Sequence, residues 1–205
     1  LNYLIQSGHL PVEQLRTFKP SICNRLDRNT SGLVAAGVSL AGLQGMNRIF
    51  KDRSIHKYYQ CLVKGEVKEK QLITGFLKKD EASNKVEIHS KQTADSVPIM
   101  TEYVPRKSNG KVTLLQVTLI TGRSHQIRAH LASIGHPILG DFKYGDRRVN
   151  ERVRSNYKIT SQMLHSFRLV MPEDLPAPLH YLGKKEFSAP LPESFLRVMK
   201  GEGLA

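Results

Sequence analysis

Between residues 57 and 121 the chain contains several segments rich in aromatic and β-branched residues, which favour β-strands. These segments cover residues 57–67, 85–90, 98–105 and 111–121. The last two flank RKSNGK, whose Asn109-Gly110 pair is typical of a tight hairpin turn. Gly65 is expected to end the first strand. Strands joined by such short turns pair antiparallel, so this region predicts a sheet as the centre of the fold.

Two other segments have the apolar spacing of helices. Residues 39–51 place apolar side chains three or four positions apart behind Ser39, a residue suited to capping a helix amino terminus. Residues 123–135 repeat that spacing, with Arg123 opening the helix and Gly135 where a helix commonly ends. A strand, a glycine and a helix therefore follow a run of mostly antiparallel strands. The chain is predicted to be α+β and dominated by strands.

The overall composition indicates a globular protein with a polyanionic partner. The chain has 205 residues, of which 40% are hydrophobic and 24% charged, as expected for one folded domain. An excess of 31 Lys and Arg over 18 Asp and Glu gives a net charge of +13, which suits nucleic acid, and the basic residues are dispersed along the chain. The two cysteines, Cys23 and Cys61, form no CxxC pair and are expected to be small buried residues in a reducing compartment. No apolar run approaches about 18 residues and no secretion leader is visible, so we expect a cytoplasmic location and no membrane partner.

The predicted helix at 123–135 carries polar residues beside its apolar stripe. Steps of 100° place Arg123, Gln126 and His130 on one flank and Arg128 on the other. An arginine at the edge of the core needs a polar partner, unless its stem covers apolar surface and its head reaches water. His125 and His130 are five residues apart and therefore do not lie on one face of the helix, so we expect no metal site.

The segment RLDRNTSGLV, residues 25–34, holds a carboxylate between two arginines. Arg25 and Arg28 favour the ionised form of Asp27, which suits nucleophilic or general-base work. Alternatively, the segment is only a turn that caps the end of a strand. Ser31 lacks the GxSxG context of an activated nucleophile. The residues alone therefore predict a basic, nucleic-acid-binding α+β protein with a carboxylate held by arginine.

Three ordered blocks resemble the RluA family of RNA pseudouridine synthases. NRLDRNTSGLV resembles the family's HRLDxxTSGL signature, and KYYQCLVKG resembles its K-x-Y strand. TGRSHQIRAHLASIGHPILGDFKYG resembles the third motif, while LHSFRLVM and SAPLPESF resemble the closing strands. The resemblance spans roughly residues 20–196. It implies a mixed, mainly antiparallel sheet with flanking helices and a central basic cleft.

The resemblance also implies a reaction and its catalytic residues. Such enzymes convert uridine in RNA to pseudouridine without cofactor or metal. Asp27 matches the catalytic aspartate, which either attacks covalently or removes a ribose proton. Tyr59 matches the tyrosine that stacks on the target uracil and can take part in proton transfer, and Arg123 matches the arginine that pairs with the aspartate.

Further residues are implied to contact RNA, either rRNA or tRNA, in a protein expected to be monomeric. They are Arg25, Arg28, Thr30, Lys57, His125, Gln126 and Arg128. Asn24 stands where the family usually has His. We expect residues 1–205 to form one catalytic domain. Its opening residues, LNYLIQSGHL, resemble the interior of a domain and leave amino-terminal trimming open.

Two alternatives to this function remain. The first is a non-catalytic RNA-binding module, which would have no need of Asp27, Tyr59 and Arg123 together. The second is a basic hydrolase that uses Asp27 on a nucleotide, although no clustered metal ligands accompany it.

Overall fold

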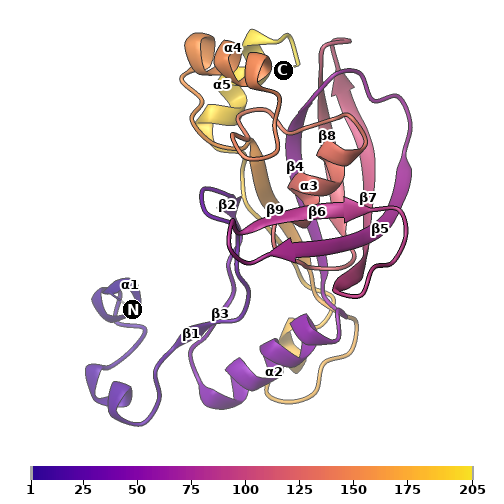
Figure 1. Cartoon of the computed structure of the whole chain (residues 1–205). Helices are drawn as coiled ribbons and strands as arrows, with labels where there is room; N and C mark the ends of the chain where they lie inside the picture. Colours follow the sequence, from indigo (N-terminus) through magenta and orange to yellow (C-terminus); the bar gives the residue numbers. More distant parts are fainter. Residues whose placement is uncertain (1, 205) are drawn as a thin grey trace.

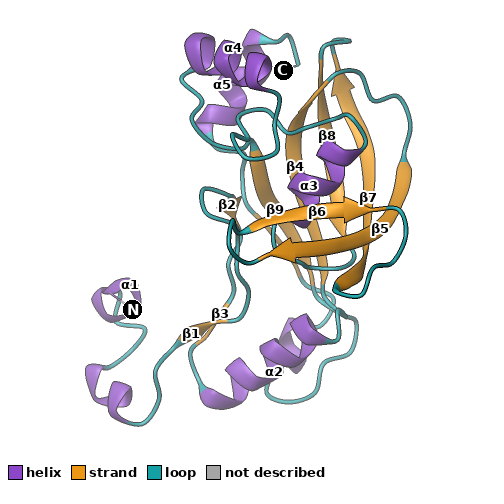
Figure 2. Cartoon of the chain, in the orientation of Figure 1, coloured by secondary structure: helices purple, strands orange, loops and turns teal. Residues whose placement is uncertain are grey.

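The strand segments pair into one sheet in the computed structural model, which describes residues 2–204 (Figures 1 and 2). Its strands are β2 (Ser31–Gly32), β4 (His56–Lys64), β5 (Gln71–Asp80), β6 (Lys85–His89), β7 (Ser96–Ser108), β8 (Val112–Leu119), β9 (Leu164–Val170) and β10 (Glu186–Ser188). The order across the sheet is β10-β9-β4-β8-β7-β5-β6. Every pairing is antiparallel except that of β2 with β9, which is parallel. The predicted α+β class and mixed, mainly antiparallel sheet are confirmed.

The turn signals read from the sequence lie where they were predicted. β7 and β8 form a hairpin whose tip contains Asn109 and Gly110, and Gly110 has a positive φ of 81°. Gly65 follows the last residue of β4 with a φ of 84°, a backbone conformation that favours glycine. β5 was not predicted, because a glycine lies in its middle and charged residues occupy its end.

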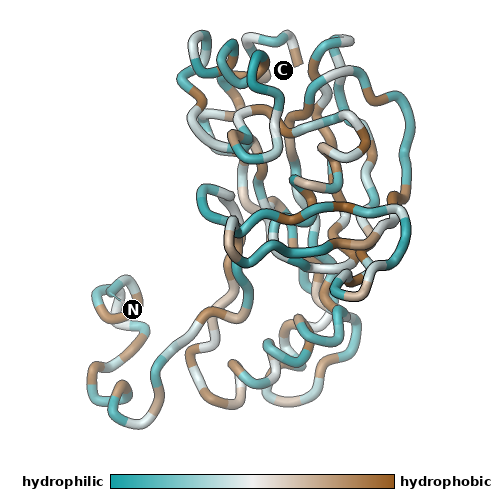
Figure 3. The backbone as a smooth tube through the Cα atoms, in the orientation of Figure 1, coloured by the Kyte–Doolittle hydropathy of each residue, from teal (hydrophilic) through white to brown (hydrophobic). Residues whose placement is uncertain are grey.

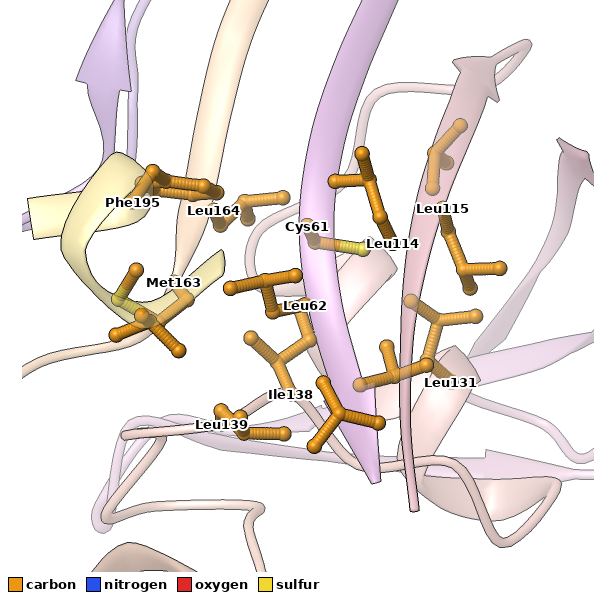
Figure 4. Close-up of a cluster of buried hydrophobic side chains, with 14 of the residues drawn as sticks. Cys61, Leu62, Leu114, Leu115, Leu131, Ile138, Leu139, Met163, Leu164 and Phe195 are labelled. Atoms are coloured by element: carbon orange, nitrogen blue, oxygen red, sulfur yellow. The ribbon is translucent and has the colours of Figure 1, made fainter. Parts of the chain in front are cut away.

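The core lies on the inner face of the central strands, where apolar side chains from distant segments meet (Figure 4). Hydrophobic and hydrophilic residues are intermixed along the strands, as the colours of Figure 3 show. β4 and β8 pair in register from Tyr58↔Thr118 to Lys64↔Val112 and supply the most deeply buried residues, including Leu62 and Leu115. Cys61 is buried, as predicted, whereas Cys23 is half-buried.

Helices other than α1 lie around this sheet. The helices are α1 (Asn2–Gln6), α2 (Leu40–Lys51), α3 (Gln126–Ser133), α4 (Arg147–Tyr157) and α5 (Glu193–Gly201), with 3-10 turns η1 (Val12–Arg16) and η2 (His180–Leu182). α2 is confirmed, including its cap, since the Ser39 side chain accepts a hydrogen bond from Gly42 N. α2 packs Met46 and Ile49 into a second apolar cluster with Leu169. None of the helices within residues 2–204 is long and apolar enough to cross a membrane.

Two carboxy-terminal elements differ from the expectation. SAPLPESF was expected to form a closing strand, yet only its first residue belongs to β10 and its end begins α5. The reason is local: Pro192 precedes the helix in an extended conformation, and Phe195 and Val198 turn one helical face into the core. α4 was not predicted because its sequence is strongly polar overall, although Val149, Val153 and Tyr157 recur every four residues on the face that meets the core.

The amino-terminal segment lies apart from the sheet. α1 and η1 are well separated from the strands in Figure 1. The chain then enters the body through β1 (Ser21–Ile22), which pairs with β3 (Ala36–Gly37) in a small two-stranded sheet. The loop between these short strands contains the Asp27 segment.

Candidate active site

The loop that carries Asp27 is closed at its base by an asparagine side chain. Asn24 donates from Nδ2 to Leu33 O at 3.3 Å and accepts from Ala35 N through Oδ1 at 2.7 Å. Within the loop, Thr30 N donates to Asp27 O at 2.9 Å. The residue that replaces the family's usual His therefore holds the two ends of this loop together.

The same loop is joined to β9 at a position that only glycine can occupy. Gly32 has a φ of 113°, and a Cβ there would lie 2.1 Å from Ser166 O. Next to it, Ser31 Oγ lies 2.8 Å from His165 Nδ1. Gln162 Nε2 donates to Arg28 O at 2.7 Å and to Thr30 Oγ1 at 3.1 Å. These contacts fix the loop against β9 and against Gln162, which lies just before that strand.

Asp27 forms its ion pair with Arg128. The Arg128 Nη1 to Asp27 Oδ2 distance is 3.4 Å, and the two side chains are 8% and 23% exposed. Arg128 also makes a two-point contact with Asp141, from Nε at 2.7 Å and from Nη2 at 2.9 Å. One guanidinium thus bridges two carboxylates, and its planar shape allows this where an ammonium could not.

The expectation that Arg123 pairs with Asp27 is wrong. Arg123 is exposed and takes part in no ion pair within residues 2–204. The cause is the start of α3, which begins at Gln126 after His125 in the left-handed conformation, with a φ of 55°. Arg123 therefore lies in the turn before the helix, and Arg128 lies on the side that faces Asp27.

Gln126 also has a different role from the predicted RNA contact. It is 2% exposed, and its side chain accepts from Arg123 N at 3.1 Å and from Thr121 Oγ1 at 2.8 Å. Its amide nitrogen donates to Met100 O and Thr101 Oγ1, each at 3.0 Å. These four hydrogen bonds use both the oxygen and the nitrogen of the side-chain amide, and they fix the start of α3.

Asp141 is the buried anchor of the site. Besides Arg128, it receives hydrogen bonds from the backbone N–H groups of Lys143 and Tyr144 at 2.9 and 3.0 Å. Burial alone would raise the pKa of Asp141, but these hydrogen bonds and the charge of Arg128 outweigh it and hold that pKa below its ordinary value. The ionised carboxylate fixes the guanidinium in place.

Tyr59 lies in β4 with its ring buried. It is 7% exposed, and burial raises the pKa of Tyr59 to about 12, with the Asp27 carboxylate acting in the same direction and the Ser166 hydroxyl against it. The phenol therefore remains protonated at neutral pH and lies near enough to Asp27 to respond to its charge. The charge of Asp27 thus acts on Tyr59, and the catalytic roles expected of the two residues stay predictions.

Tyr144 completes the cluster and was not predicted. Arg128 lies over its ring, 5.2 Å from guanidinium carbon to ring centre. The Tyr144 hydroxyl lies 2.9 Å from His125 Nδ1 and accepts from Val86 N at 3.0 Å. Burial lowers the pKa of His125, although the Asp27 charge offsets part of that shift. The signal for Asp141 and Tyr144 was present as polar residues directly after an apolar run in GHPILGDFKYG.

The remaining predicted contacts are divided between surface and interior. Arg25 and Arg28 are exposed and Thr30 is half-buried on the Asp27 loop. Lys57 is only 8% exposed, and burial, together with the charge of Arg53, lowers the pKa of Lys57. Lys57 lies two residues before Tyr59 and so on the same face of β4.

The chain matches a protein-family model and several known proteins. The model of the RNA pseudouridylate synthase family matches residues 4–133, which is more than half of the chain. An RNA pseudouridine synthase of Mycoplasma genitalium is 34% identical over 161 residues, or 76% of this chain and 48% of that protein. Ribosomal large subunit pseudouridine synthase C of Vibrio vulnificus is 34% identical over 143 residues, or 67% of this chain and 44% of that protein. The chain therefore spans about half the length of these relatives.

Solved structures show the same fold. Human RNA pseudouridylate synthase domain containing 4 superposes with a TM-score of 0.74 at 20% identity, over 96% of this chain and 78% of that one. Human RNA pseudouridylate synthase domain containing 1 gives a TM-score of 0.66 at 24% identity, over 94% of this chain and 83% of that one. The fold agrees with the family model and with the two relatives that match in sequence. The chain belongs to the RNA pseudouridylate synthase family.

Proposed function

We propose that the chain converts uridine in structured RNA to pseudouridine. The observation that carries this proposal is the Asp27 carboxylate, held by a guanidinium that Asp141 fixes, with a protonated phenol close by. A protein that only binds RNA gains nothing from an arginine that holds one half-buried and one fully buried carboxylate, because carboxylates do not attract a polyanion. Family membership supports the same reaction.

The reaction rearranges one nucleoside without adding or removing atoms. The bond from the ribose C1′ to uracil N1 breaks, and a bond from C1′ to C5 forms. The proton on C5 leaves, and N1 becomes protonated. Asp27 either attacks the ribose or removes one of its protons, and both routes need an ionised, correctly directed carboxylate. No cofactor is required by either route.

The named residues divide this work. Arg128 orients Asp27 and balances its charge, since it is itself fixed by Asp141. Tyr59 offers a ring for stacking on the target uracil and one O–H that can transfer a proton. Arg25 and Arg28, exposed on the Asp27 loop, would hold the flipped nucleotide and its flanking phosphates. Ribosomal RNA is the first substrate to test, because one relative is named for it.

The test compares the parent protein with Asp27→Asn on deproteinised cellular RNA. The substitution keeps the shape of the side chain and removes the negative charge, so neither attack nor proton removal is available. We expect new pseudouridines with the parent protein and none above background with the variant, while both bind RNA. Equal conversion by the two proteins would refute the role of Asp27.

If neither protein converts any RNA tried, the RNA-binding module becomes the better interpretation. A longer chain that restores the length of the relatives is the control for that result, because this chain spans about half of them. Mapping pseudouridines in cells that lack the protein would then identify the natural uridine.

A further inference from the structure

Ser166 is a buried polar residue that the proposed mechanism does not yet use. It lies in β9 and is 0% exposed, yet its hydroxyl has no hydrogen-bond partner within residues 2–204. Its neighbour His165 cannot supply one, because Nδ1 lies 2.8 Å from Ser31 Oγ and Nε2 lies 3.3 Å from Ala189 O. A buried hydroxyl without a partner is costly, and such groups in native structures call for an explanation.

A β-bulge places Ser166 opposite Tyr59. β4 pairs Tyr58 with Arg168 and the next residue, Tyr59, with Ser166, so Phe167 is an extra residue in β9. Bulges of this kind are common next to active sites, where they redirect a side chain. Directly opposite residues of an antiparallel pair project from the same face with their Cβ atoms about 4.5–5.5 Å apart. The Ser166 side chain is therefore presented to Tyr59 by the pairing of the strands.

Ser166 also contacts the segment that follows Asp27. Gly32 of β2 pairs with Ser166 in parallel register, and Leu33 N donates to Ser166 O at 2.9 Å. One residue of β9 thus lies between the strand that carries Tyr59 and the loop that carries Asp27. The Ser166 hydroxyl lies close enough to Tyr59 to lower the pKa of the phenol as a hydrogen-bonding neighbour would, although no hydrogen bond of ordinary geometry joins the two groups within residues 2–204.

We propose that Ser166 is a positioning residue, whose hydroxyl donates to the phenolic oxygen of Tyr59 when the target nucleotide is bound. This inference rests on the proposed function. A donor on the phenolic oxygen leaves the O–H of Tyr59 free and sets its direction toward the reacting nucleoside. The orphan hydroxyl and the bulge then have one explanation, since both serve the orientation of Tyr59.

The first test removes the hydroxyl and follows stability and activity together. For Ser166→Ala we expect kcat to fall about tenfold, the value of one hydrogen bond, with KM unchanged. The midpoint of urea unfolding should stay the same or rise, because the lost group had no partner in the free protein. The matched control is Thr113→Val, which removes a buried hydroxyl that donates to Gly65 O at 2.7 Å. That variant should lose stability and keep kcat.

The second test asks whether Ser166 acts through the Tyr59 hydroxyl. Ser166→Ala should cause no further loss of kcat when it is combined with Tyr59→Phe, because the group it orients is already absent. An equal loss in both backgrounds would overturn the proposal, as would a fall in the unfolding midpoint of Ser166→Ala. Ser166→Cys preserves volume with a weak donor and should restore part of kcat.

These outcomes separate the inference from the function on which it rests. If the parent protein converts no uridine, the proposed function fails by the Asp27 test. The unfolding midpoints of Ser166→Ala and Thr113→Val would still test Ser166, because a packing role alone predicts a loss of stability for both.

Discussion

Two sets of arginines in this protein have opposite environments. At the Asp27 site, the Arg128 side chain is 8% exposed and contacts two carboxylates, one of which is fully buried. In α4, Arg147, Arg148, Arg152 and Arg154 are all exposed. Arg147 pairs with Glu151 at 2.9 Å, but both side chains are more than half exposed. Arg148 and Arg154 form no ion pair within residues 2–204.

The comparison shows that burial decides what an arginine contributes. Water and salt screen an exposed arginine, which then adds little to stability and acts on a polyanion mainly through net charge. A desolvated arginine must satisfy its donors inside the protein, so its geometry becomes specific and its removal costly. Arg128 is therefore expected to control chemistry. Arg148 and Arg154 of α4 are expected to affect only RNA affinity, whereas Arg152 pairs with the nearly buried Glu202.

The largest effect is expected at the buried anchor. Asp141→Asn replaces the fully buried carboxylate beside Arg128 with a neutral amide and leaves the half-buried Asp27 as the ionised partner of the guanidinium. Breaking a buried pair of this kind costs about 3–5 kcal/mol of unfolding free energy. Urea denaturation at neutral pH measures this loss. Glu151→Gln, which removes the exposed partner of Arg147, is the control and should change stability by less than about 1 kcal/mol. Equal effects of the two substitutions would remove the contrast between the regions.

Arg128→Lys should reduce kcat by about 10²–10³-fold, the range seen when one oriented donor to a reacting charge is lost. Lysine keeps the positive charge but cannot contact Asp141 at two points and Asp27 at a third. Pseudouridine formation under saturating RNA measures the loss. Arg123→Lys is the matched control and should retain near-parental turnover. The reverse result would restore Arg123 as the partner of Asp27.

Tyr59→Phe should lower kcat by about 10²-fold, because it removes an O–H that can transfer a proton and keeps the ring. RNA binding should survive, since stacking needs only the ring. Single-turnover conversion and a filter-binding assay separate the two properties. Normal turnover would mean that Tyr59 contributes stacking alone.

The smallest effect is expected from the exposed set. Arg148→Ala combined with Arg154→Ala should leave kcat unchanged and lower the slope of log affinity against log salt by about 1.4–1.8, if each arginine contacts one phosphate. The control removes the same charge from Arg16 and Lys19, in the amino-terminal segment that lies apart from the sheet (Figure 1). Titrations at several salt concentrations would show whether α4 is a specific RNA contact or only part of the net charge. Identical slopes for both double variants would support net charge alone.

Much of the fold could be predicted because its signals are local. Four of the strands, the Asn109-Gly110 hairpin and α2 with its Ser39 cap depend on residues within a few positions of one another. α4 and α5 escaped prediction for a different reason. Both helices have an apolar face, but α4 is strongly polar overall, and the segment that begins α5 was expected to be a closing strand.

Two residues of the candidate site were predicted from the sequence, but the arginine that pairs with Asp27 was not. Asp27 and Tyr59 were identified from motifs, but Arg123 was chosen over Arg128. Helical periodicity could not decide between them, because the first residue of α3 depends on the left-handed His125 and on Gln126, whose side chain caps the turn. The predicted helix begins at Arg123, whereas α3 begins at Gln126, so Arg123 lies in the preceding turn and Arg128 meets Asp27.

The sequence by itself determined the strands, the basic charge and a loop with a carboxylate between arginines, because these follow from composition and from neighbours along the chain. Only the tertiary structure decided which arginine meets Asp27, since that contact joins residues 101 positions apart. It also decided that Asp141 anchors this arginine and that a bulge turns Ser166 toward Tyr59. The physical reason is that burial and pairing of polar groups depend on how whole elements pack, and no local pattern encodes the desolvation of a single side chain.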